Sequence, residues 1–163
     1  MEGNVYARAY GNPGDEVTAT FFSDLVRCET RLYNALNDRL RRRHGITASQ
    51  YEFLRYLREH PHARVGDLAA FFAVGVGATS KGIDRLAARE LVSRRPDPAD
   101  GRSSQLALTD AGTRLLHDAD TAFAEIGDLL RAALPQEQIH ATAQALRRLR
   151  GRLEDDRTGT PIG

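Results

Sequence analysis

The middle of the chain, between residues 60 and 91, contains two short helical patterns separated by a stretch with glycine. Val65, Leu68 and Phe72 recur at the spacing that places apolar side chains on one face of a helix. A second pattern of this kind runs from about residue 78 to residue 90, and Gly75-Val-Gly77 lies between the two. Two short helices joined by a tight turn form a helix-turn-helix. The sequence therefore predicts this unit, and the remaining elements have to pack around it.

A β-hairpin is predicted directly after the second of these helices. Residues 91–95 and 103–108 form short alternating segments, and residues 96–102 between them are rich in proline, aspartate and glycine. Alternation favours strands, and a connection of this composition favours a turn. A further helix is predicted from about residue 47 to residue 60, begun by a capping box of Thr47 and Gln50. Together these elements predict a winged helix-turn-helix over residues 46–109, with a two-stranded β wing.

Long helices are predicted on both sides of this unit, over residues 15–45 and 110–153. The first has an apolar stripe made of Phe22, Leu25, Leu32, Leu36 and Leu40. A helix of about 28 residues is roughly 40 Å long, and its stripe exceeds what one small domain covers. We therefore expect a mainly α fold in which the N- and C-terminal helices form a helical dimerisation region. Residues 1–14 are expected to be a flexible arm, and residues 154–163 a disordered tail.

The second helix of the helix-turn-helix has two different faces. Thr79, Ile83 and Leu86 share one face and are expected to pack inward. The opposite face is small near the start of the helix and basic beyond it, and it consists of Gly77, Ser80, Lys81 and Arg85. Small residues let a recognition helix enter the major groove, where hydroxyl and cationic groups meet phosphates and base edges. The alternative is a solvated helix face, since one lysine and one arginine do not decide the matter.

The total charge gives no information on function, because 23 Lys and Arg residues face 22 Asp and Glu residues. Any binding of nucleic acid has to rest on where the charges lie. From Lys81 to Arg102 there are six basic and four acidic residues, and Arg95 belongs to this basic group. Arg102 is predicted at the tip of the hairpin, where Asp100 can hold its guanidinium extended toward a narrow minor groove.

Several characteristic runs follow one another along the chain: Gly45-Ile-Thr-Ala-Ser-Gln-Tyr51, Ala78-Thr-Ser-Lys-Gly-Ile-Asp-Arg-Leu86, Arg94-Arg-Pro-Asp-Pro-Ala-Asp-Gly-Arg102 and Leu108-Thr-Asp-Ala-Gly112. In order and spacing, these runs resemble the signature of the MarR family of winged helix-turn-helix regulators. The resemblance covers roughly residues 16–153. Two positions depart from it. Glu90 stands where a glycine usually follows the recognition helix, which puts a left-handed helix cap in doubt, and Gly82 inside that helix indicates a close backbone approach or a softened helix.

The resemblance implies a transcriptional regulator, expected to be a repressor, that binds a pseudo-palindromic operator in double-stranded DNA as a homodimer. A small-molecule effector would release it. Recognition helices would enter successive major grooves, with half-sites about 34–36 Å apart, and the wings would reach the flanking minor grooves. The residues expected to contact DNA are Gly77, Ser80, Lys81, Arg85, Arg95, Asp100 and Arg102. An effector site is expected between the DNA-binding lobe and the dimer helices, near Tyr33, His44, Tyr51 and Arg55.

Other functions stay open as alternatives. The lone Cys28, beside Arg27, allows a redox-responsive regulator. A winged helix that binds a protein instead of DNA belongs to a different class, and the basic wing argues against it. An enzyme is disfavoured, because residues 75–81 lack the third glycine of a dinucleotide loop and the Gly-Lys-Ser/Thr order of a P-loop. A metal sensor using Cys28, His44 and His117 is disfavoured too, because no pair has a metal-binding spacing.

No cofactor, catalytic group or metal site is predicted. The longest apolar runs, such as residues 67–74, are too short to cross a membrane, and no basic-then-apolar signal segment opens the chain. A single cysteine agrees with a reducing compartment. We therefore expect a cytoplasmic protein with no membrane partner.

Overall fold

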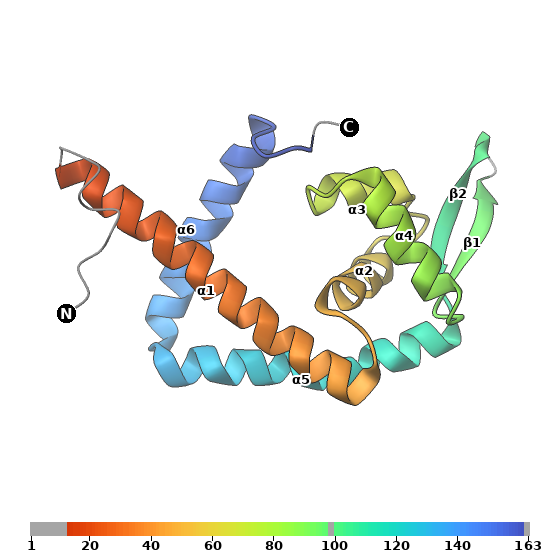
Figure 1. Cartoon of the computed structure of the whole chain (residues 1–163), viewed down its shortest axis with the longest axis horizontal. Coiled ribbons are helices and arrows are strands. Elements are labelled where there is room, and N and C mark those ends of the chain that lie inside the picture. The colour runs from red at the N-terminus through yellow and green to blue at the C-terminus, as the bar shows by residue number, and fades with distance from the viewer. Residues whose placement is uncertain (1–12, 98–99, 162–163) are drawn as a thin grey trace.

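The computed structural model describes residues 13–97 and 100–161, with side chains for residues 16–96 and 104–161. In chain order, its elements are α1 (Pro13–His44), α2 (Ala48–Glu59), α3 (Val65–Phe71), α4 (Val76–Ala87), β1 (Val92–Asp97), β2 (Asp100–Leu108), α5 (Asp110–Ala133) and α6 (Gln136–Asp155). β1 and β2 form one antiparallel two-stranded sheet (Figure 1). The predicted fold class is confirmed. Among the described helices, none is long and apolar enough to cross a membrane.

The winged helix-turn-helix forms a lobe at one end of the molecule (Figure 1). Its core contains the fully buried side chains Leu54, Leu68, Ile83, Leu86 and Leu106, which come from α2, α3, α4 and β2. The capping box predicted for α2 is present: the N–H of Gln50 donates to Oγ1 of Thr47 over 3.2 Å, and the N–H of Thr47 donates to Oε1 of Gln50 over 2.9 Å. This core and cap fix the face that α4 leaves outside the lobe.

The turn between α3 and α4 lies earlier in the chain than the sequence predicts. α4 begins at Val76 and not at residue 78, so Gly77 is a helical residue. The reason is that the carbonyl of Gly75, the N-cap residue, already accepts the N–H of Thr79 over 3.0 Å. The left-handed backbone conformation of this turn is adopted by Ala73, with φ +50°, and by neither glycine. At its other end α4 stops at Ala87, three residues before the predicted end.

Glu90 adopts the left-handed conformation that a glycine usually adopts after the end of a helix. The presence of a side chain at this position had put that conformation in doubt. The φ of Glu90 is +57°, and the following N–H, of Leu91, donates to the carbonyl of Leu86 over 3.0 Å. This pattern, in which a bond spans the end of the helix, is the one that glycine usually supports. Oγ1 of Thr109 donates to the carbonyl of Glu90 over 2.6 Å and helps to hold the conformation. The departure from the family pattern changes the residue and keeps the backbone geometry.

Glu90→Gly is therefore expected to raise the free energy of unfolding by about 0.5–1 kcal/mol. The substitution removes the steric penalty of a left-handed residue with a Cβ, and the larger freedom of glycine in the unfolded chain offsets part of the gain. Urea unfolding measures the change. Glu90→Ala, which keeps a Cβ, is the control and should stay within about 0.5 kcal/mol of the wild-type protein. A Glu90→Gly variant less stable than Glu90→Ala would contradict the argument.

The hairpin is longer than predicted, and its tip is shorter. Asp97 pairs with Asp100, so only residues 98 and 99, which lie outside the described residues, connect the two strands. Pro96 pairs with Ser104, and the register shifts between Pro96 and Asp97. Arg102 therefore lies within β2, in the irregular part of the strand, and not at the tip as predicted. The prediction is wrong because proline and glycine favour a turn in sequence but do not always end a strand: proline is tolerated at strand edges and bulges.

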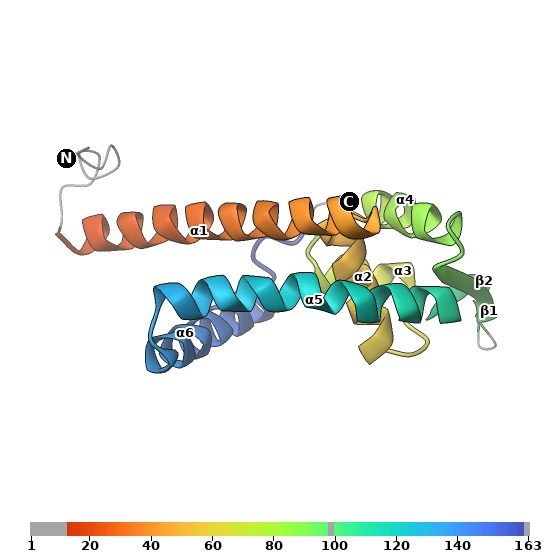
Figure 2. The same ribbon diagram turned by 90° about the horizontal axis from the view of Figure 1, so that it is seen from below.

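The long helices extend well beyond the lobe. α1 has 32 residues and is therefore about 48 Å long. Its C-terminal half lies along α5, and α6 turns back from the end of α5 (Figure 2). α1 begins at Pro13, inside the predicted arm, because proline is well suited to a first helical turn. Residues 1–12 of that arm lie outside the described residues. α6 continues to Asp155, and backbone bonds such as Thr158 N–H to the Leu153 carbonyl (2.8 Å) form turns after it, where a disordered tail was predicted.

Much of the apolar surface of these long helices is uncovered. Of the predicted stripe on α1, Leu36 and Leu40 are buried, whereas Phe22 is 66% exposed. α6 has no buried residue. The exposed apolar side chains of the two helices are Val17, Phe21, Phe22, Val26, Tyr33, Leu146, Leu149 and Leu153. A monomer leaves this surface in water, which is unfavourable in proportion to its area.

Candidate nucleic-acid interface

The outward face of α4 is arranged as the sequence predicts. Thr79, Ile83 and Leu86 are buried, which confirms the inward face. Gly77, Lys81 and Arg85 are exposed on the other side, and Ser80 is half-buried. α4 lies beside the hairpin (Figure 1), so the basic face and the wing belong to the same end of the molecule. This is the arrangement of a helix that enters the major groove next to a wing.

Gly82 is required by a close contact and not by flexibility of the helix. A Cβ on Gly82 would lie 2.8 Å from Cε2 of Phe53, which is closer than real Cβ contacts. Phe53 comes from α2 and is only 6% exposed, so its ring has little freedom to move away. Of the two interpretations of Gly82, the close approach is the one that the structure supports.

Two of the six basic residues counted between Lys81 and Arg102 are engaged within the protein. Nη2 of Arg94 donates to Oδ1 of Asp84 over 2.6 Å and joins β1 to α4. Nη1 of Arg89 donates to the carbonyl of Gly45 over 2.8 Å and joins the end of α4 to the end of α1. Both arginines stabilise the position of α4 relative to its neighbours. Exposed cationic groups that remain on the described part of this surface are Lys81, Arg85 and Arg95.

The base of the wing is anchored to the loop before α3. The N–H of Leu106 donates to the carbonyl of Ala63 over 2.8 Å, and Nδ1 of His62 lies 2.8 Å from Oε1 of Gln105. Arg95 on β1 pairs with Gln105 and is exposed. The side chains of Asp100 and Arg102 lie outside the part that the structure describes. The predicted contact between them is therefore untested, while the backbone places both residues in β2.

A polar contact joins the lobe to the long helices. The Tyr51 hydroxyl of α2 donates to Oδ1 of Asp120 on α5 over 2.8 Å, and Nη1 of Arg58 donates to Oδ2 of the same carboxylate over 2.9 Å. Burial and the hydrogen bond to Asp120 raise the pKa of Tyr51. Burial alone would raise the pKa of Asp120, but the hydrogen bonds from Arg58 and Tyr51 outweigh it and lower that pKa. The carboxylate therefore stays ionised and holds α2 in a fixed orientation on α5.

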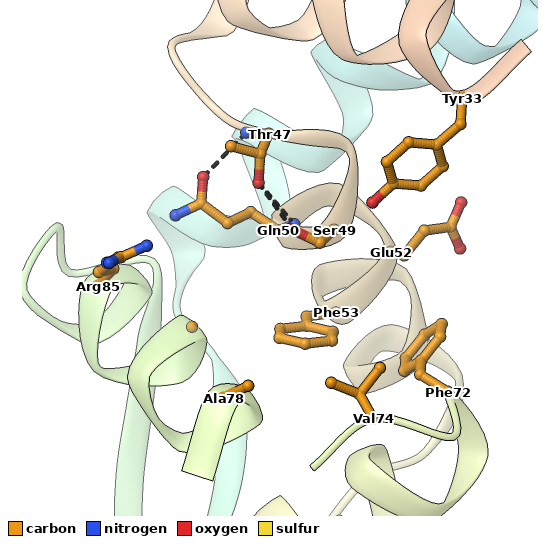
Figure 3. A pocket seen from close by; sticks show the side chains of 11 residues that line it. Tyr33, Thr47, Ser49, Gln50, Glu52, Phe53, Phe72, Val74, Ala78 and Arg85 are labelled. Atoms are coloured by element: carbon orange, nitrogen blue, oxygen red, sulfur yellow. Dashed lines mark hydrogen bonds between the residues drawn. The ribbon is translucent and has the colours of Figure 1, made fainter. Parts of the chain in front are cut away.

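A cleft of about 410 Å³ lies between α1, α2 and α4. Its lining consists of Tyr33, Thr47, Ser49, Gln50, Glu52, Phe53, Phe72, Val74, Ala78, Gly82 and Arg85. The ring of Phe53 lies in its middle, between α4 and the first turns of α2 (Figure 3). A volume of this size falls in the range of small-molecule sites, which run from about 300 to 1,000 Å³. The cleft shares Arg85 with the outward face of α4, a connection that the sequence does not reveal.

The four residues expected near an effector do not come together in this cleft. Tyr33 lines it. Tyr51 is bound to Asp120, and the Arg55 guanidinium lies 4.7 Å from the ring centre of Phe123, so both belong to the contact of α2 with α5. His44 is the last residue of α1, where its carbonyl accepts from Arg89 over 3.4 Å.

Cys28 is exposed on α1. Among the described residues, no group of three His, Cys, Asp or Glu side chains is placed to hold a metal ion. Cys28, His44 and His117 are therefore not grouped around a metal site. The side chain of His117 is 88% exposed, and its Nδ1 lies 3.7 Å from Oδ1 of Asp118.

Comparison with known proteins places the sequence signature in one family. A profile of the MarR family matches residues 44–103, which include α2, α3, α4 and most of the hairpin. The uncharacterized HTH-type transcriptional regulator YxaD of Bacillus subtilis is 39% identical over 72 residues, 44% of this chain and 50% of YxaD. The HTH-type transcriptional repressor NicR of Pseudomonas putida is 34% identical over 105 residues, 64% of this chain and 66% of NicR. The matches thus span half of the first relative and about two thirds of the second.

The fold agrees with this relationship. The crystal structure of Sco3205, a MarR family transcriptional regulator from Streptomyces coelicolor in complex with DNA, has a TM-score of 0.77 to this chain at 23% identity, and the match covers 88% of this chain and 91% of Sco3205. The relatives carry the names of transcriptional regulators and not of enzymes, in agreement with the prediction from the sequence. The profile match, the relatives and the fold together show that the chain belongs to the MarR family of winged helix-turn-helix transcriptional regulators.

Proposed function

We propose that the protein is a homodimeric repressor of transcription that binds a pseudo-palindromic operator in double-stranded DNA and is released by a small molecule. The observation that carries the proposal is the outward face of α4, where Lys81 and Arg85 are exposed beside the wing while Thr79, Ile83 and Leu86 hold the helix to the lobe. A cationic face on a rigidly held helix suits contacts to phosphates and base edges. The repressor role is supported by the name of the relative NicR. The proposed place of action is the compartment that holds the chromosome, the cytoplasm of a prokaryotic cell.

The uncovered apolar surface of α1 and α6 supports the dimer. Phe21 and Phe22 are 53% and 66% exposed, and Leu146, Leu149 and Leu153 line a groove of about 290 Å³ on α6 with Arg147 and Arg150. A second copy of the chain would cover these side chains and place a second α4 on the same side of the assembly. Two-fold symmetry of the protein would then match the two half-sites of an operator.

The cleft beside α4 is the proposed effector site. It is lined by Tyr33 of α1 and by Ala78, Gly82 and Arg85 of α4, so an occupant would touch both a dimer helix and the recognition helix. A ligand shifts the equilibrium between two arrangements of α4 only if it binds one of them more tightly. Arg85 is expected to contact DNA, and an occupant that holds it in the cleft would weaken that contact.

Capture of genomic DNA fragments by the purified protein, followed by sequencing, tests the proposal. The expected result is a set of fragments that share an inverted repeat whose half-sites lie about one helical turn, 34–36 Å, apart. Footprinting should show protection on both half-sites by one dimer. Enrichment of no common sequence, or protection of a single asymmetric site by a monomer, would contradict sequence-specific binding by a symmetric dimer.

Arg102→Ala is expected to reduce operator affinity by about 1–3 kcal/mol and to lower the salt dependence by about one counterion per wing. The physical reason is that a guanidinium inserted in a narrow minor groove lies in a strongly negative potential. Asp100→Ala should cause a milder loss, because it removes only a group that orients the arginine. Fluorescence anisotropy over a salt series measures both, and melting curves should stay nearly unchanged. If Arg102→Ala leaves affinity and salt slope as in the wild type, the wing makes no such contact.

A further inference from the structure

The cleft between α1, α2 and α4 combines an apolar floor with a carboxylate on one wall. Phe53, Phe72 and Val74 supply apolar surface, and the rings of Phe53 and Phe72 lie 5.4 Å apart between their centres. Glu52 lines the same cleft from α2. Figure 3 shows Tyr33 pointing from α1 toward the side of the cleft where Ser49 and Glu52 lie. This side of the cleft therefore presents an aromatic surface next to one negative charge and the hydroxyl groups of Tyr33 and Ser49.

The carboxylate of Glu52 is only weakly compensated by the protein. Its side chain is 29% exposed, and its ion pair is with Arg55, one turn further along α2, at an Nη1 to Oε1 distance of 3.4 Å. That distance is long for a charge-assisted hydrogen bond. The same Arg55 guanidinium also lies over the ring of Phe123, 4.7 Å from its centre, on the side of α5. Burial raises the pKa of Glu52 more than Arg55 lowers it. A ligand with a positive group would supply the compensating charge that Arg55 provides only in part.

The side of the cleft that carries the cationic Arg85 is more exposed to solvent than the side that carries Glu52. Arg85 is exposed at the end of the cleft formed by α4, whereas Glu52 lies on the opposite wall, formed by α2 (Figure 3). A solvated guanidinium gains little from one more ion pair, because water already screens it. A partly buried carboxylate beside aromatic rings gains more, since a cation there also interacts with the ring faces. The wall with Glu52 therefore gains more from a ligand of opposite charge than the wall with Arg85 does, which favours a positive ligand over a negative one.

We propose that this cleft binds a small aromatic amine, with its ammonium group against Glu52 and its ring against Phe53 and Phe72. Tyr33 and Ser49 offer hydroxyl oxygens as further acceptors for the ammonium protons. The ring of the amine would face Ala78 and Gly82, so the bound amine would touch the recognition helix directly. The proposal rests on the proposed function only for the effect of the amine on DNA, since the binding of the amine itself needs no DNA.

Three indole compounds that differ in charge test the choice of ligand. Tryptamine is a cation, indole-3-ethanol is neutral and indole-3-acetate is an anion, while the ring is the same. Isothermal titration of the full chain at millimolar ligand is expected to give the tightest binding for tryptamine, by about tenfold or more over indole-3-acetate. Glu52→Gln should remove this preference. Glu59→Gln, an exposed position on the same helix that does not line the cleft, should leave it unchanged.

Each other outcome contradicts the proposal. Tighter binding of indole-3-acetate than of tryptamine would assign the cleft to anions. Equal affinity of the wild type and Glu52→Gln for tryptamine would show that the amine binds elsewhere, and no heat with any of the three compounds would show that the cleft takes no aromatic amine. The effect on DNA is read separately by anisotropy with captured fragments. If tryptamine binds but the affinity for DNA is unchanged, the amine site is supported and only its role as an effector site is contradicted. If the protein binds no DNA at all, only the proposed function as a DNA-binding regulator is contradicted.

Discussion

Gly112→Ala is expected to reduce the free energy of unfolding by about 3 kcal/mol, at the upper end of the usual effect of overpacking. Gly112 is buried in the first turn of α5, and its N–H donates to Oγ1 of the N-cap residue Thr109 over 3.0 Å. A Cβ on Gly112 would lie 2.0 Å from the carbonyl oxygen of Leu91 and 3.0 Å from its carbonyl carbon. The clash is with backbone, and this carbonyl also accepts the N–H of Thr109 over 3.2 Å. Neither side can move without breaking the junction of the wing with α5.

Urea unfolding measures this loss, and a second glycine of the same helix provides the control. A Cβ on Gly127 would meet only the end of the Arg131 side chain, at 3.1 Å. Because that side chain is exposed and flexible, Gly127→Ala should be neutral or stabilising by up to about 1 kcal/mol, the helix propensity difference between glycine and alanine. Equal stability of Gly112→Ala and the wild type would show that α5 is not in close contact with Leu91.

Leu149→Glu is expected to separate the dimer and to weaken operator binding by about 100-fold or more. Leu149 is 39% exposed on α6 and lines the groove with Leu146 and Leu153, so a carboxylate there would be desolvated in a dimer interface. A monomer carries one recognition helix and loses the gain from two linked binding events, which amounts to a factor of about 10² to 10⁴. The substitution leaves the core of the lobe untouched, because Leu149 packs on none of its residues.

Sedimentation velocity and anisotropy together check this prediction. Gln144→Glu is the matched control, because residue 144 is exposed and lies on the side of α6 away from Leu146 and Leu153. This control should sediment as a dimer and bind the operator like the wild type. A Leu149→Glu protein that remains dimeric, or a wild-type protein that is monomeric while it binds DNA fully, would show that α6 is not in the interface.

The elements of the lobe could be predicted from the sequence because their signals are local. The capping box of Thr47 and Gln50 and the inward set of α4 depend on spacings of three to four residues, and both are present. The ends of the elements depend on competition between neighbouring backbone bonds, and there the sequence was a poorer guide. Gly75 became a helix cap, Ala73 took the left-handed turn, and Glu90 ended α4 in the conformation expected of glycine.

Features of the site that depend on distant segments could not be predicted in this way. Arg89 and Arg94 belong to the six basic residues between Lys81 and Arg102, but the sequence does not reveal that the carbonyl of Gly45 and the carboxylate of Asp84 engage them. The cleft combines residues of α1, α2 and α4 with Phe72 and Val74 of the segment between α3 and α4, and Tyr33 is its only lining residue among those expected near an effector. The same holds for the contact of Gly82 with Phe53, which joins α4 to α2. A glycine in a helix is visible in the sequence, whereas the ring that requires it is not.

Binding of DNA by the outward face of α4 can be measured by anisotropy with the captured operator for the wild type, Lys81→Ala and Arg85→Ala. Arg131→Ala is the control, because Arg131 is a similarly exposed cation at the far end of α5, paired with Asp128 over 2.6 Å. We expect operator affinity to fall by about tenfold or more in each α4 variant, with unchanged melting curves, and to stay at the wild-type value in the control. A variant that contacts only phosphate should weaken all sequences alike, and one that reads a base should relax preference at one operator position. Wild-type affinity in both α4 variants would show that this face of α4 does not bind DNA.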